Sequence, residues 1–289
     1  MFSLSKILLP IDFSERSFRA TRSAVPLAKQ FNSELTLLHV ISTHRDLTSA
    51  EGAVKWAAPP DALRAERGRD LDSFMREELR DLKLKRVVVE GDPAQEIVDH
   101  AHLEEFDLIM MATHGYGPFR RFLLGSVAAK VLHDAHCPVW TGIHAEQVSG
   151  IEAGRPTHIA CAIDLDSQSR HTLNWAGHLA EELKAKLTVV HVVKSLVPHT
   201  LSFDLSPEWR KHVRDEAMTA LDNLKKDLGV ECAIKLEIGD VHKGVCLAAR
   251  ELIADLVVIN RGTDGGFGGR LRTNAYAIIR DSPCPVISV

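Results

Sequence analysis

The chain contains one pattern twice, and this internal repeat constrains its fold more than any other feature. The stretch "KILLPIDFSERSFRATRSAVPLAKQFNSELTLLHV" begins at Lys6, and "HIACAIDLDSQSRHTLNWAGHLAEELKAKLTVVHV" begins at His158. Matching pairs follow in the same order: Ile11-Asp12 with Ile163-Asp164, Asp107-Leu108 with Asp255-Leu256, and Cys137-Pro138 with Cys284-Pro285. The separation shrinks slowly along the chain, which indicates a duplication followed by small deletions in loops.

The repeat divides the 289 residues into two units of ordinary domain size. We expect an N-terminal domain over 1–145 and a C-terminal domain over 155–289. The stretch "TGIHAEQVSGIEAGRPT" joins them.

Each unit alternates apolar, strand-like runs with helical patterns. In the first unit, "KILLPI", "ELTLLHVI", "KRVVVE", "DLIMMA" and "PVWTG" predict five strands. Helices are predicted from Ser14 as the cap to about Phe31, over 61–82, over 93–103, and from Ser126 to about Ala135. The stretch 43–60 has no clear period and predicts a loop. Strands that are apolar on both faces and alternate with helices predict a doubly wound α/β fold with parallel sheets.

Composition and charge argue against several classes of protein. The net charge of −4 gives no reason to expect nucleic acid or an anionic membrane as a partner. No apolar run approaches the roughly 20 residues of a membrane helix, and the start of the chain is typical of a first strand rather than a signal peptide. Five scattered cysteines are typical of reduced thiols, so we expect a cytoplasmic protein.

The stretch "ATHGYGPFRRFLLGS", residues 112–126, is the strongest candidate for a ligand site. In an open parallel sheet, ligands bind beyond the carboxyl ends of the strands where the winding reverses. Asp12 ends the first strand and would face the same crevice. Gly115 and Gly125 let backbone N–H groups approach an anion, and Gly125 stands where a helix begins. Ser126 can cap that helix or donate its hydroxyl to a phosphate oxygen.

The same residues also fit a purely structural interpretation. Glycines are common between a strand and a helix, serine is a common cap, and Asp12 could cap the next helix. Arg120 and Arg121 could flank a phosphate, but a solvated surface is the favoured place for them.

Metal and catalytic patterns are weak. His133, His136 and Cys137 lie close in sequence, and His242 and Cys246 stand four apart on a predicted helix. A structural zinc site needs four ligands and no second pair stands out, so no metal site is predicted. His39 and His191 are expected to pack or hydrogen-bond at strand ends. The chain has no G-x-S-x-G elbow and no P-loop lysine, so no catalytic residues are predicted.

The motifs together resemble the universal stress protein family, in its tandem form with two UspA-like domains. ATP-binding members carry G-x2-G-x9-G-[ST] after the fourth strand, and the matching positions here are Ala112, Gly115, Gly125 and Ser126. The resemblance extends through "LLPIDFS", "LLHV", "GDPAQEIVDHA" and "GSVAAKVLHDAHCPV" and covers nearly the full length. It implies two tandem Rossmann-like (adenine nucleotide alpha hydrolase-like) domains, each a five-stranded parallel sheet with helices on both faces.

The resemblance also implies a pocket for ATP, or for AMP or ADP, in the N-terminal domain. Its adenosine side would be lined by Pro10, Ile11, Asp12 and the backbone of Val40. Its ribose-phosphate side would be lined by Met111, Ala112, His114, Gly115, Gly125, Ser126 and Val127. Mg²⁺ or Mn²⁺ could accompany the phosphates. Ala112 in place of the first glycine adds one methyl group near the ligand, which is expected to weaken binding without excluding it.

The second unit departs from this motif. The corresponding positions hold Ile259, Gly262, Arg272 and Thr273. Ile259 would crowd the sugar, Arg272 replaces the glycine at the helix entrance, and Asp264 opposes an anion. We expect this unit to have lost the nucleotide geometry, although Arg272 could instead hold a different anion by its charge.

These features predict a non-enzymatic, nucleotide-responsive stress-response regulator. Two alternatives stay open at this point: a nucleotide-independent interaction or chaperone-like module, and a weak ATP hydrolase. In UspA-like dimers the last strands meet, which predicts an internal pseudo-dimer through the last strands of the two domains. Association of two chains as a homodimer is left open.

Overall fold

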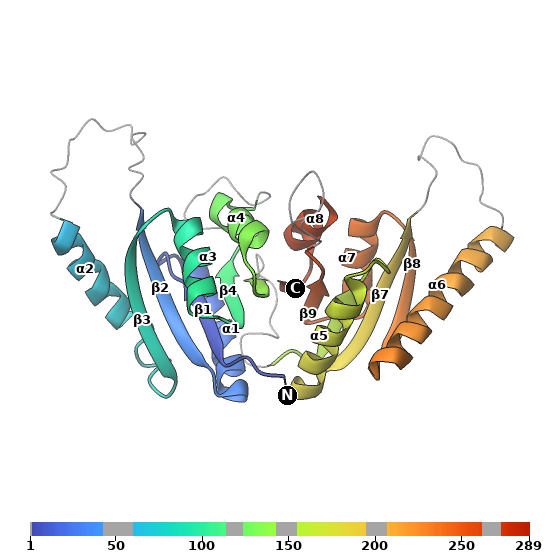
Figure 1. The fold of residues 1–289 in the computed structure, drawn as a ribbon, viewed down its shortest axis with the longest axis horizontal. Coiled ribbons are helices and arrows are strands. Elements are labelled where there is room, and N and C mark those ends of the chain that lie inside the picture. Colours follow the sequence, from blue (N-terminus) through green and yellow to red (C-terminus); the bar gives the residue numbers. More distant parts are fainter. Residues whose placement is uncertain (1, 43–59, 114–123, 143–154, 195–206, 262–272) are drawn as a thin grey trace. The chain divides into compact units, whose positions relative to one another are not determined.

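The structure is a computed structural model, and it describes residues 2–42, 60–113, 124–142, 155–194, 207–261 and 273–289 (Figure 1). It divides into two compact units. The first is Ser3–Trp140, and the second is Thr141–Val289 together with Phe2.

The first unit is a parallel sheet covered on both faces. Its elements are β1 (Lys6–Pro10), α1 (Glu15–Phe31), β2 (Glu34–Ser42), α2 (Pro60–Ser73), β3 (Lys83–Gly91), α3 (Pro93–Leu103), β4 (Leu108–Ala112), α4 (Ser126–Asp134) and β5 (Val139–Gly142). The strand order is β3-β2-β1-β4-β5, and β1 pairs in parallel with both β2 and β4. The winding therefore reverses between β1 and β4. Helices α1 and α2 cover one face and α3 and α4 the other (Figure 1).

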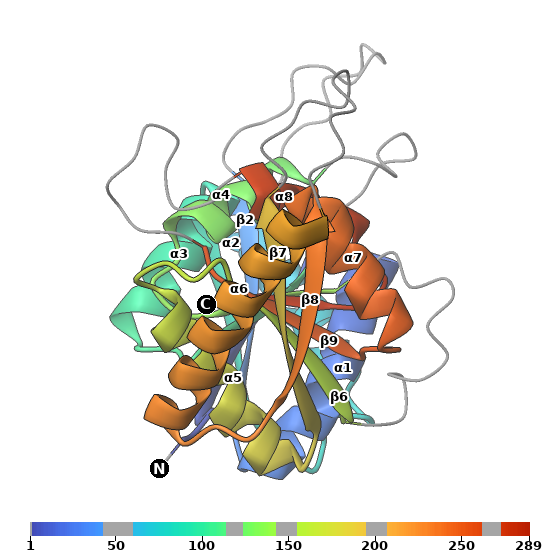
Figure 2. The ribbon, with the colours of Figure 1, turned by 90° about the vertical axis from the view of Figure 1, so that its right-hand side faces the viewer.

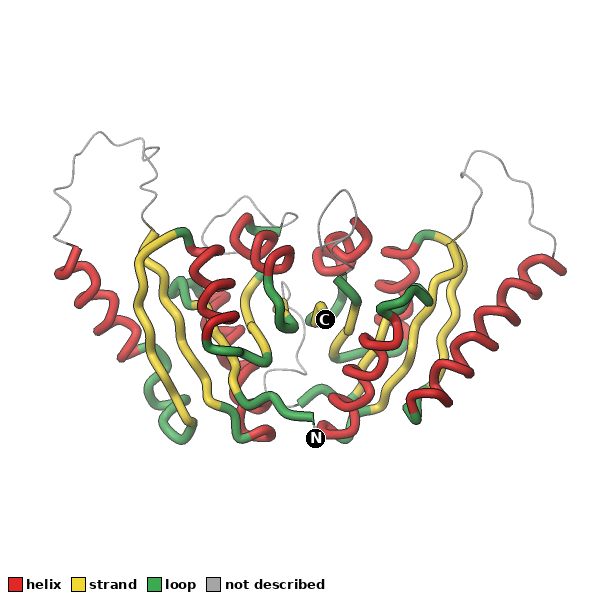
Figure 3. Tube along the Cα trace, viewed as in Figure 1, coloured by secondary structure: helices red, strands yellow, loops and turns green. Residues whose placement is uncertain are grey.

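The second unit repeats this arrangement. Its elements are β6 (His158–Ala162), α5 (Ser169–Leu183), β7 (Lys186–Lys194), α6 (Pro207–Leu228), β8 (Ala233–Gly239), α7 (Val241–Glu251), β9 (Leu256–Ile259), α8 (Thr273–Asp281) and β10 (Val286–Ser288). The strand order is β8-β7-β6-β9-β10. Figure 2 shows α6 running beside β7 and β8, and Figure 3 shows strands flanked by helices in each unit. The predicted pair of parallel, doubly wound α/β sheets is confirmed.

The central strands are buried on both faces because helices cover both sides of each sheet. Ile7, Leu8 and Leu9 of β1 are fully buried, and so are Val257 and Val258 of β9. Their continuous apolar runs are therefore the expected pattern for parallel strands.

The duplication is also visible in the backbone. Residues other than glycine adopt a positive φ at matching places in the two units: Phe13 (60°) and Leu165 (59°), Asn32 (53°) and Lys184 (54°), and Glu105 (54°) and Ile253 (50°). L-residues rarely adopt this conformation, so its recurrence means that three tight turns have the same shape in both units.

The repeated Asp-Leu pair has a structural role at the amino ends of the sheets. The Asp107 carboxylate accepts a hydrogen bond from the backbone N–H of Lys6 at 2.9 Å, and the Asp255 carboxylate accepts one from His158 at 3.0 Å. Each aspartate therefore satisfies the first N–H of its central strand, which would otherwise lack a partner.

The predicted helix boundaries hold at α1, α3 and α4, but α2 is shorter than expected. Ser14 caps α1 by accepting from the N–H of Ser17, and Asp92 caps α3 just before Pro93. The prediction of a helix over 61–82 is wrong in its second half, because α2 ends at Ser73. Met75 has a φ of 45°, which a right-handed helix cannot accommodate. The loop predicted over 43–60 lies outside the described residues up to 59.

Candidate functional site

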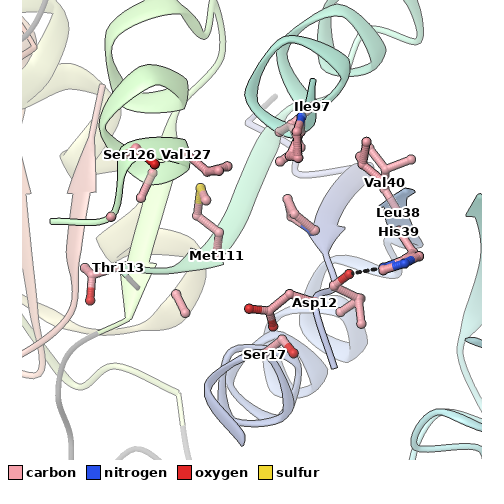
Figure 4. Close-up of a pocket in the computed structure, with 16 residues that line it drawn as sticks. Asp12, Ser17, Leu38, His39, Val40, Ile97, Met111, Thr113, Ser126 and Val127 are labelled. Atoms are coloured by element: carbon pink, nitrogen blue, oxygen red, sulfur yellow. Dashed lines mark hydrogen bonds between the residues drawn. The ribbon is translucent and has the colours of Figure 1, made fainter. Parts of the chain in front are cut away.

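A cavity of about 310 Å³ opens at the carboxyl ends of β1, β2 and β4, where the winding of the first unit reverses (Figure 4). All the predicted site residues that the structure describes line it: Pro10, Ile11, Asp12, Val40, Met111, Ala112, Gly125, Ser126 and Val127. His114 and Gly115 lie outside the described residues. One sheet edge thus brings together residues that stand more than a hundred positions apart in the sequence.

Sequence reasoning missed several lining residues. These are Ser17, Leu38, His39, Pro93, Ile97, Thr113 and Ala128. Most of them adjoin a motif residue, so their neighbours were the available signal. Pro93 and Ile97 come instead from the first turns of α3. This helix follows β3, whose carboxyl end lies at the same edge of the sheet as the cavity. Gly91-Asp92 at the end of β3 recurs as Gly239-Asp240 in the second unit, and this repeated pair could have indicated their place.

The backbone of Val40 presents a donor and an acceptor to the cavity. Strand β1 pairs with β2 only as far as Pro10 opposite Leu38, and Ile11 then donates its N–H to the Leu38 carbonyl at 2.8 Å. Backbone groups alternate in direction along a strand, so Val40 faces the same side as Leu38. Because β1 has ended there, the N–H and C=O of Val40 point into the space that β1 leaves.

Three helices have their amino-terminal ends at this cavity, and they differ in how those ends are capped. Helix α1 is capped by the side chain of Ser14 and α3 by that of Asp92. Helix α4 has Gly125 at its cap position, which offers no side-chain hydrogen bond. The first N–H groups of a helix have no partner within it, so α4 presents unpaired N–H groups and the positive end of its dipole to the cavity.

Of the two roles considered for Ser126, helix cap or hydroxyl donor to a ligand, the structure does not support the cap. Ser126 is the first helical residue of α4, with an exposed side chain, and the cap position belongs to Gly125. The N–H of Gly125 is occupied, because it donates to the carbonyl of Thr113 at 2.8 Å. The Ser126 hydroxyl therefore stays available to a ligand at the rim of the cavity.

Asp12 supports the cap of α1 without being the cap itself. Its Oδ1 accepts from the N–H of Ser14 at 2.9 Å and from the Ser14 hydroxyl at 2.6 Å. The left-handed turn at Phe13 makes this contact possible. The carboxylate is thus held in one orientation while the residue stays exposed at the cavity.

His39 ties β2 to the end of β1, as expected for a strand-end histidine. Its Nδ1 lies 2.7 Å from the carbonyl oxygen of Ile11, and in the second unit His191 makes the same contact with Ile163 at 2.9 Å. Burial lowers the pKa of His39, although the bond to Ile11 opposes the shift. A neutral ring at neutral pH donates from Nδ1 to this carbonyl.

The cavity combines an apolar slot with one polar end. Ile11, Leu38, Val40 and Ile97 line the slot, and the start of α4 forms the polar end. This arrangement suits a flat, largely apolar group that carries an anion. Within the described part of the lining, no nucleophile stands beside a base in the manner that covalent catalysis requires.

The corresponding place in the second unit is more closed. His191 and Val192 are 9% and 6% exposed, whereas His39 and Val40 are half-buried. Helix α7 approaches closely here, since a Cβ added at Gly244 would lie 2.9 Å from a methyl carbon of Val192. Ile259, expected to crowd a sugar, is 3% exposed at the end of β9. Gly262, Asp264 and Arg272 lie outside the described residues.

His242 and Cys246 are not placed as a metal pair. His242 Nε2 lies 2.7 Å from an oxygen of Asp281, and burial raises the pKa of the Cys246 thiol to about 11. Across the described ranges, no three His, Cys, Asp or Glu side chains form a group that could hold a metal ion. None of the helices in those ranges is both long and apolar enough to span a membrane.

Comparison with known proteins agrees with this fold. The profile of the universal stress protein family matches residues 4–141 and again 156–289. A universal stress protein of Methanocaldococcus jannaschii is 37% identical over 137 residues, which cover 46% of this chain and 79% of that protein. The Bacillus subtilis universal stress protein YxiE is 30% identical over 142 residues, covering 47% of this chain and 96% of its own length.

A solved structure shares the whole arrangement. The crystal structure of a universal stress protein from Archaeoglobus fulgidus matches with a TM-score of 0.67 and 24% identity, over 99% of this chain and 96% of that one. At this identity the likeness shows the fold alone. The two family matches cover almost the entire sequence, and the chain therefore belongs to the universal stress protein family, with two copies of its domain in tandem.

Proposed function

We propose that the first unit binds ATP or a related adenine nucleotide and that the protein acts as a nucleotide-responsive regulator of the stress response. One observation carries this proposal: a single cavity holds an outward-facing backbone pair at Val40 on one side and the uncapped start of α4 on the other. An adenine nucleotide has matching groups at its two ends.

The adenine ring fits the apolar slot. Its edge carries an acceptor beside a donor, which complements the N–H and C=O of Val40. The edge of guanine has the opposite order, so the same backbone pair disfavours it. Pro10, Ile11 and Ile97 would contact the ring, and the held carboxylate of Asp12 would accept a hydrogen bond from a ribose hydroxyl.

The phosphates fit the start of α4. Unpaired N–H groups and the helix dipole attract an anion there, and the Ser126 hydroxyl adds a donor. Met111, Ala112 and Val127 form the adjoining wall, and His114 and Gly115 would complete it. The methyl group of Ala112 reduces the space beside the sugar, so we propose binding that is weaker than with glycine. Mg²⁺ or Mn²⁺ would accompany a triphosphate.

The wider assignment follows from the family and the site. We propose a non-enzymatic protein of the cytoplasm, with domains over 1–145 and 155–289 and one nucleotide site per chain. The pairing of the two domains through their last strands and the association of two chains remain predictions.

Calorimetric titration tests the nucleotide site. ATP is titrated into the wild type, into Gly125→Arg, and into Arg272→Gly, which changes the aligned position of the second unit. We expect Gly125→Arg to weaken binding by about a hundredfold or more, because the side chain fills the approach to α4, and Arg272→Gly to leave binding unchanged. Titration with GTP should give weaker binding than ATP. No binding by the wild type, or equal binding by Gly125→Arg, would overturn the proposed site.

Two further measurements separate the alternatives. Mass spectrometry of the purified protein shows whether it carries an adenine nucleotide; a nucleotide-free protein that does not bind ATP favours an interaction or chaperone-like module. ADP release that persists through repurification and disappears in Gly125→Arg favours a weak hydrolase.

A further inference from the structure

Two exposed histidine rings meet at the far ends of α3 and α4. His102 lies in the last turn of α3, and His136 follows shortly after the end of α4. Their ring centroids are 4.9 Å apart, and the ring planes are inclined by 45°. Both residues are exposed. The helices line the nucleotide cavity with their first residues, so this pair stands at the opposite ends of the same two helices.

The spacing fits two ligands on one metal ion. A metal–imidazole bond is about 2.0–2.1 Å, which places a ring centroid about 3.2 Å from the metal. Two such centroids 4.9 Å apart subtend about 100° at the metal, between the angles of octahedral and tetrahedral coordination. Both residues are exposed, so an ion can reach this pair of rings from solvent.

We propose that His102 and His136 form a surface chelating site for a late first-row divalent cation, with Cu²⁺ held more tightly than Ni²⁺ or Zn²⁺. Neutral imidazole is a preferred ligand of these ions, and their affinities follow the Irving–Williams order. Two side chains supply part of the coordination shell, and water fills the other positions. Hard cations such as Mg²⁺ prefer oxygen ligands and do not bind here.

Two polar side chains near the pair contact other groups. His133, on the last turn of α4, has its Nδ1 2.5 Å from the Asp134 carboxylate, and Glu104 pairs with Lys85 at 3.1 Å. In the second unit, the repeat places Arg250 and Pro283 at the positions of His102 and His136. Neither can bind a cation, so the second unit does not repeat this pair.

A bound ion would join the end of α3 to the segment after α4. Because the ion binds the folded arrangement and not two separated histidines, it should stabilise the first unit, and the stabilisation should rise with the logarithm of the ion concentration once that exceeds the dissociation constant. This inference does not depend on nucleotide binding, and either proposal can fail alone.

The test is a calorimetric titration of the full chain, free of any polyhistidine tag, with CuCl₂, NiCl₂, ZnCl₂ and MgCl₂. We expect one equivalent of Cu²⁺, weaker Ni²⁺ and Zn²⁺, and no Mg²⁺. His102→Ala and His136→Ala should each weaken Cu²⁺ binding by about tenfold or more. His133→Ala is the matched control, because His133 is an exposed histidine in the last turn of α4, three residues before His136. This variant should leave Cu²⁺ binding unchanged.

Two further measurements identify the ligands and check the fold of the variants. The electron paramagnetic resonance spectrum of the Cu²⁺ form should show coupling to two nitrogen atoms in the wild type and to one in each single variant. Circular dichroism verifies that the variants keep their fold, as expected for exposed side chains. Absence of Cu²⁺ binding, binding that His102→Ala and His136→Ala do not change, or an equal loss in His133→Ala would overturn the proposal.

Discussion

The two units have the same topology but differ at the place where a ligand would bind. In the first unit, β2 runs past the end of β1 beside an open cavity, and Val40 is half-buried at its wall. In the second unit, β7 runs past β6 in the same register, yet Val192 is buried against α7. The strands alone therefore do not make a site. The two crevices differ in how far the neighbouring valine is covered, and α7 contacts the side chain of Val192 in the second unit.

The loops after the first strands differ in charge. The first unit has Asp12 followed by Ser14, whereas the second has Asp164 followed by Asp166 at the matching positions. Asp166 accepts from the N–H groups of Gln168 and Ser169 just before and at the start of α5, while the cap position itself belongs to Gln168. The second unit gains a negative charge where an anionic ligand would approach. The two units thus kept the same fold while the residues at the ligand-binding edge became different.

The largest expected effect tests whether the two cores are equivalent. Ile7 and Ile159 occupy matching positions in β1 and β6, and both are fully buried. Replacement of either by alanine should lower the free energy of unfolding of its own unit by about 3–4 kcal/mol, through lost burial and a cavity. Hydrogen exchange of the β1 and β6 amides, measured in both variants, assigns each loss to a unit. A clear loss in only one variant would show that the cores are not equivalent.

A smaller effect tests the close approach of α7. Gly244→Ala would place a methyl group 2.9–3.0 Å from the Val192 side chain, and we expect about 1 kcal/mol of destabilisation after the gain in helix propensity. The matched variant is Glu96→Ala, at the corresponding position of α3, which should change stability by no more than about 0.5 kcal/mol. Denaturant unfolding gives both values. If Gly244→Ala is stabilising, packing against α7 is not what closes the second crevice.

The charge of the strand-end loop should have a modest effect on the proposed nucleotide binding. Ser14→Asp gives the first unit the acid of the second and retains a good helix cap. We expect ATP affinity to fall by about threefold or more at low salt, because the new carboxylate repels Asp12 and removes the hydroxyl donor that holds it. The part of the difference that is due to charge should shrink at high salt. Asp166→Ser is the control and should have no effect on titration with ATP. A salt-independent change would point to altered shape instead of charge.

The smallest effect is a pH dependence confined to the second unit. Hydrogen bonds from Arg280 and from His242 lower the pKa of Asp281 to about 2, from an ordinary value near 3.8. A lowered pKa stabilises the fold above pH 4, and this contribution is lost as the pH falls toward 2. Because a third of this side chain is exposed, the effect is small. Unfolding of Asp281→Asn between pH 5 and 2 should lack this component. Asp134→Asn controls for loss of an aspartate at the same place in α4, and an unchanged slope in Asp281→Asn would contradict the assignment.

The repeat and the apolar runs were sufficient to predict the sheets, because buried parallel strands have few alternatives. They also located most of the cavity wall, since the ends of β1, β2 and β4 must meet at one edge. The early end of α2 was not predictable, because the charged sequence continues past Ser73 without a breaking residue and only the backbone at Met75 reveals the turn.

Contacts between distant segments were also beyond sequence reasoning. Pro93 and Ile97 reach the cavity because α3 packs beside α4 and β2, and the Gly-Asp pair before α3 indicates the start of a helix but not that packing. The meeting of His102 with His136 has the same cause: each is an ordinary surface residue until two helix ends are brought together. Whether Gly125 or Ser126 takes the cap position of α4 is a difference of one residue, which propensities for capping residues do not resolve.

The hydrogen bond from Gly125 to Thr113 has a consequence for how this protein can change. It holds the end of β4 and the entrance of α4 at a fixed separation, whatever sequence joins them. The entropy of closing a loop depends only weakly on its length once its ends are held. Residues can therefore be inserted between these two ends with little cost to folding. This connection is a natural graft point, where a new recognition sequence can be added to an existing pocket without redesign of the domain that carries it.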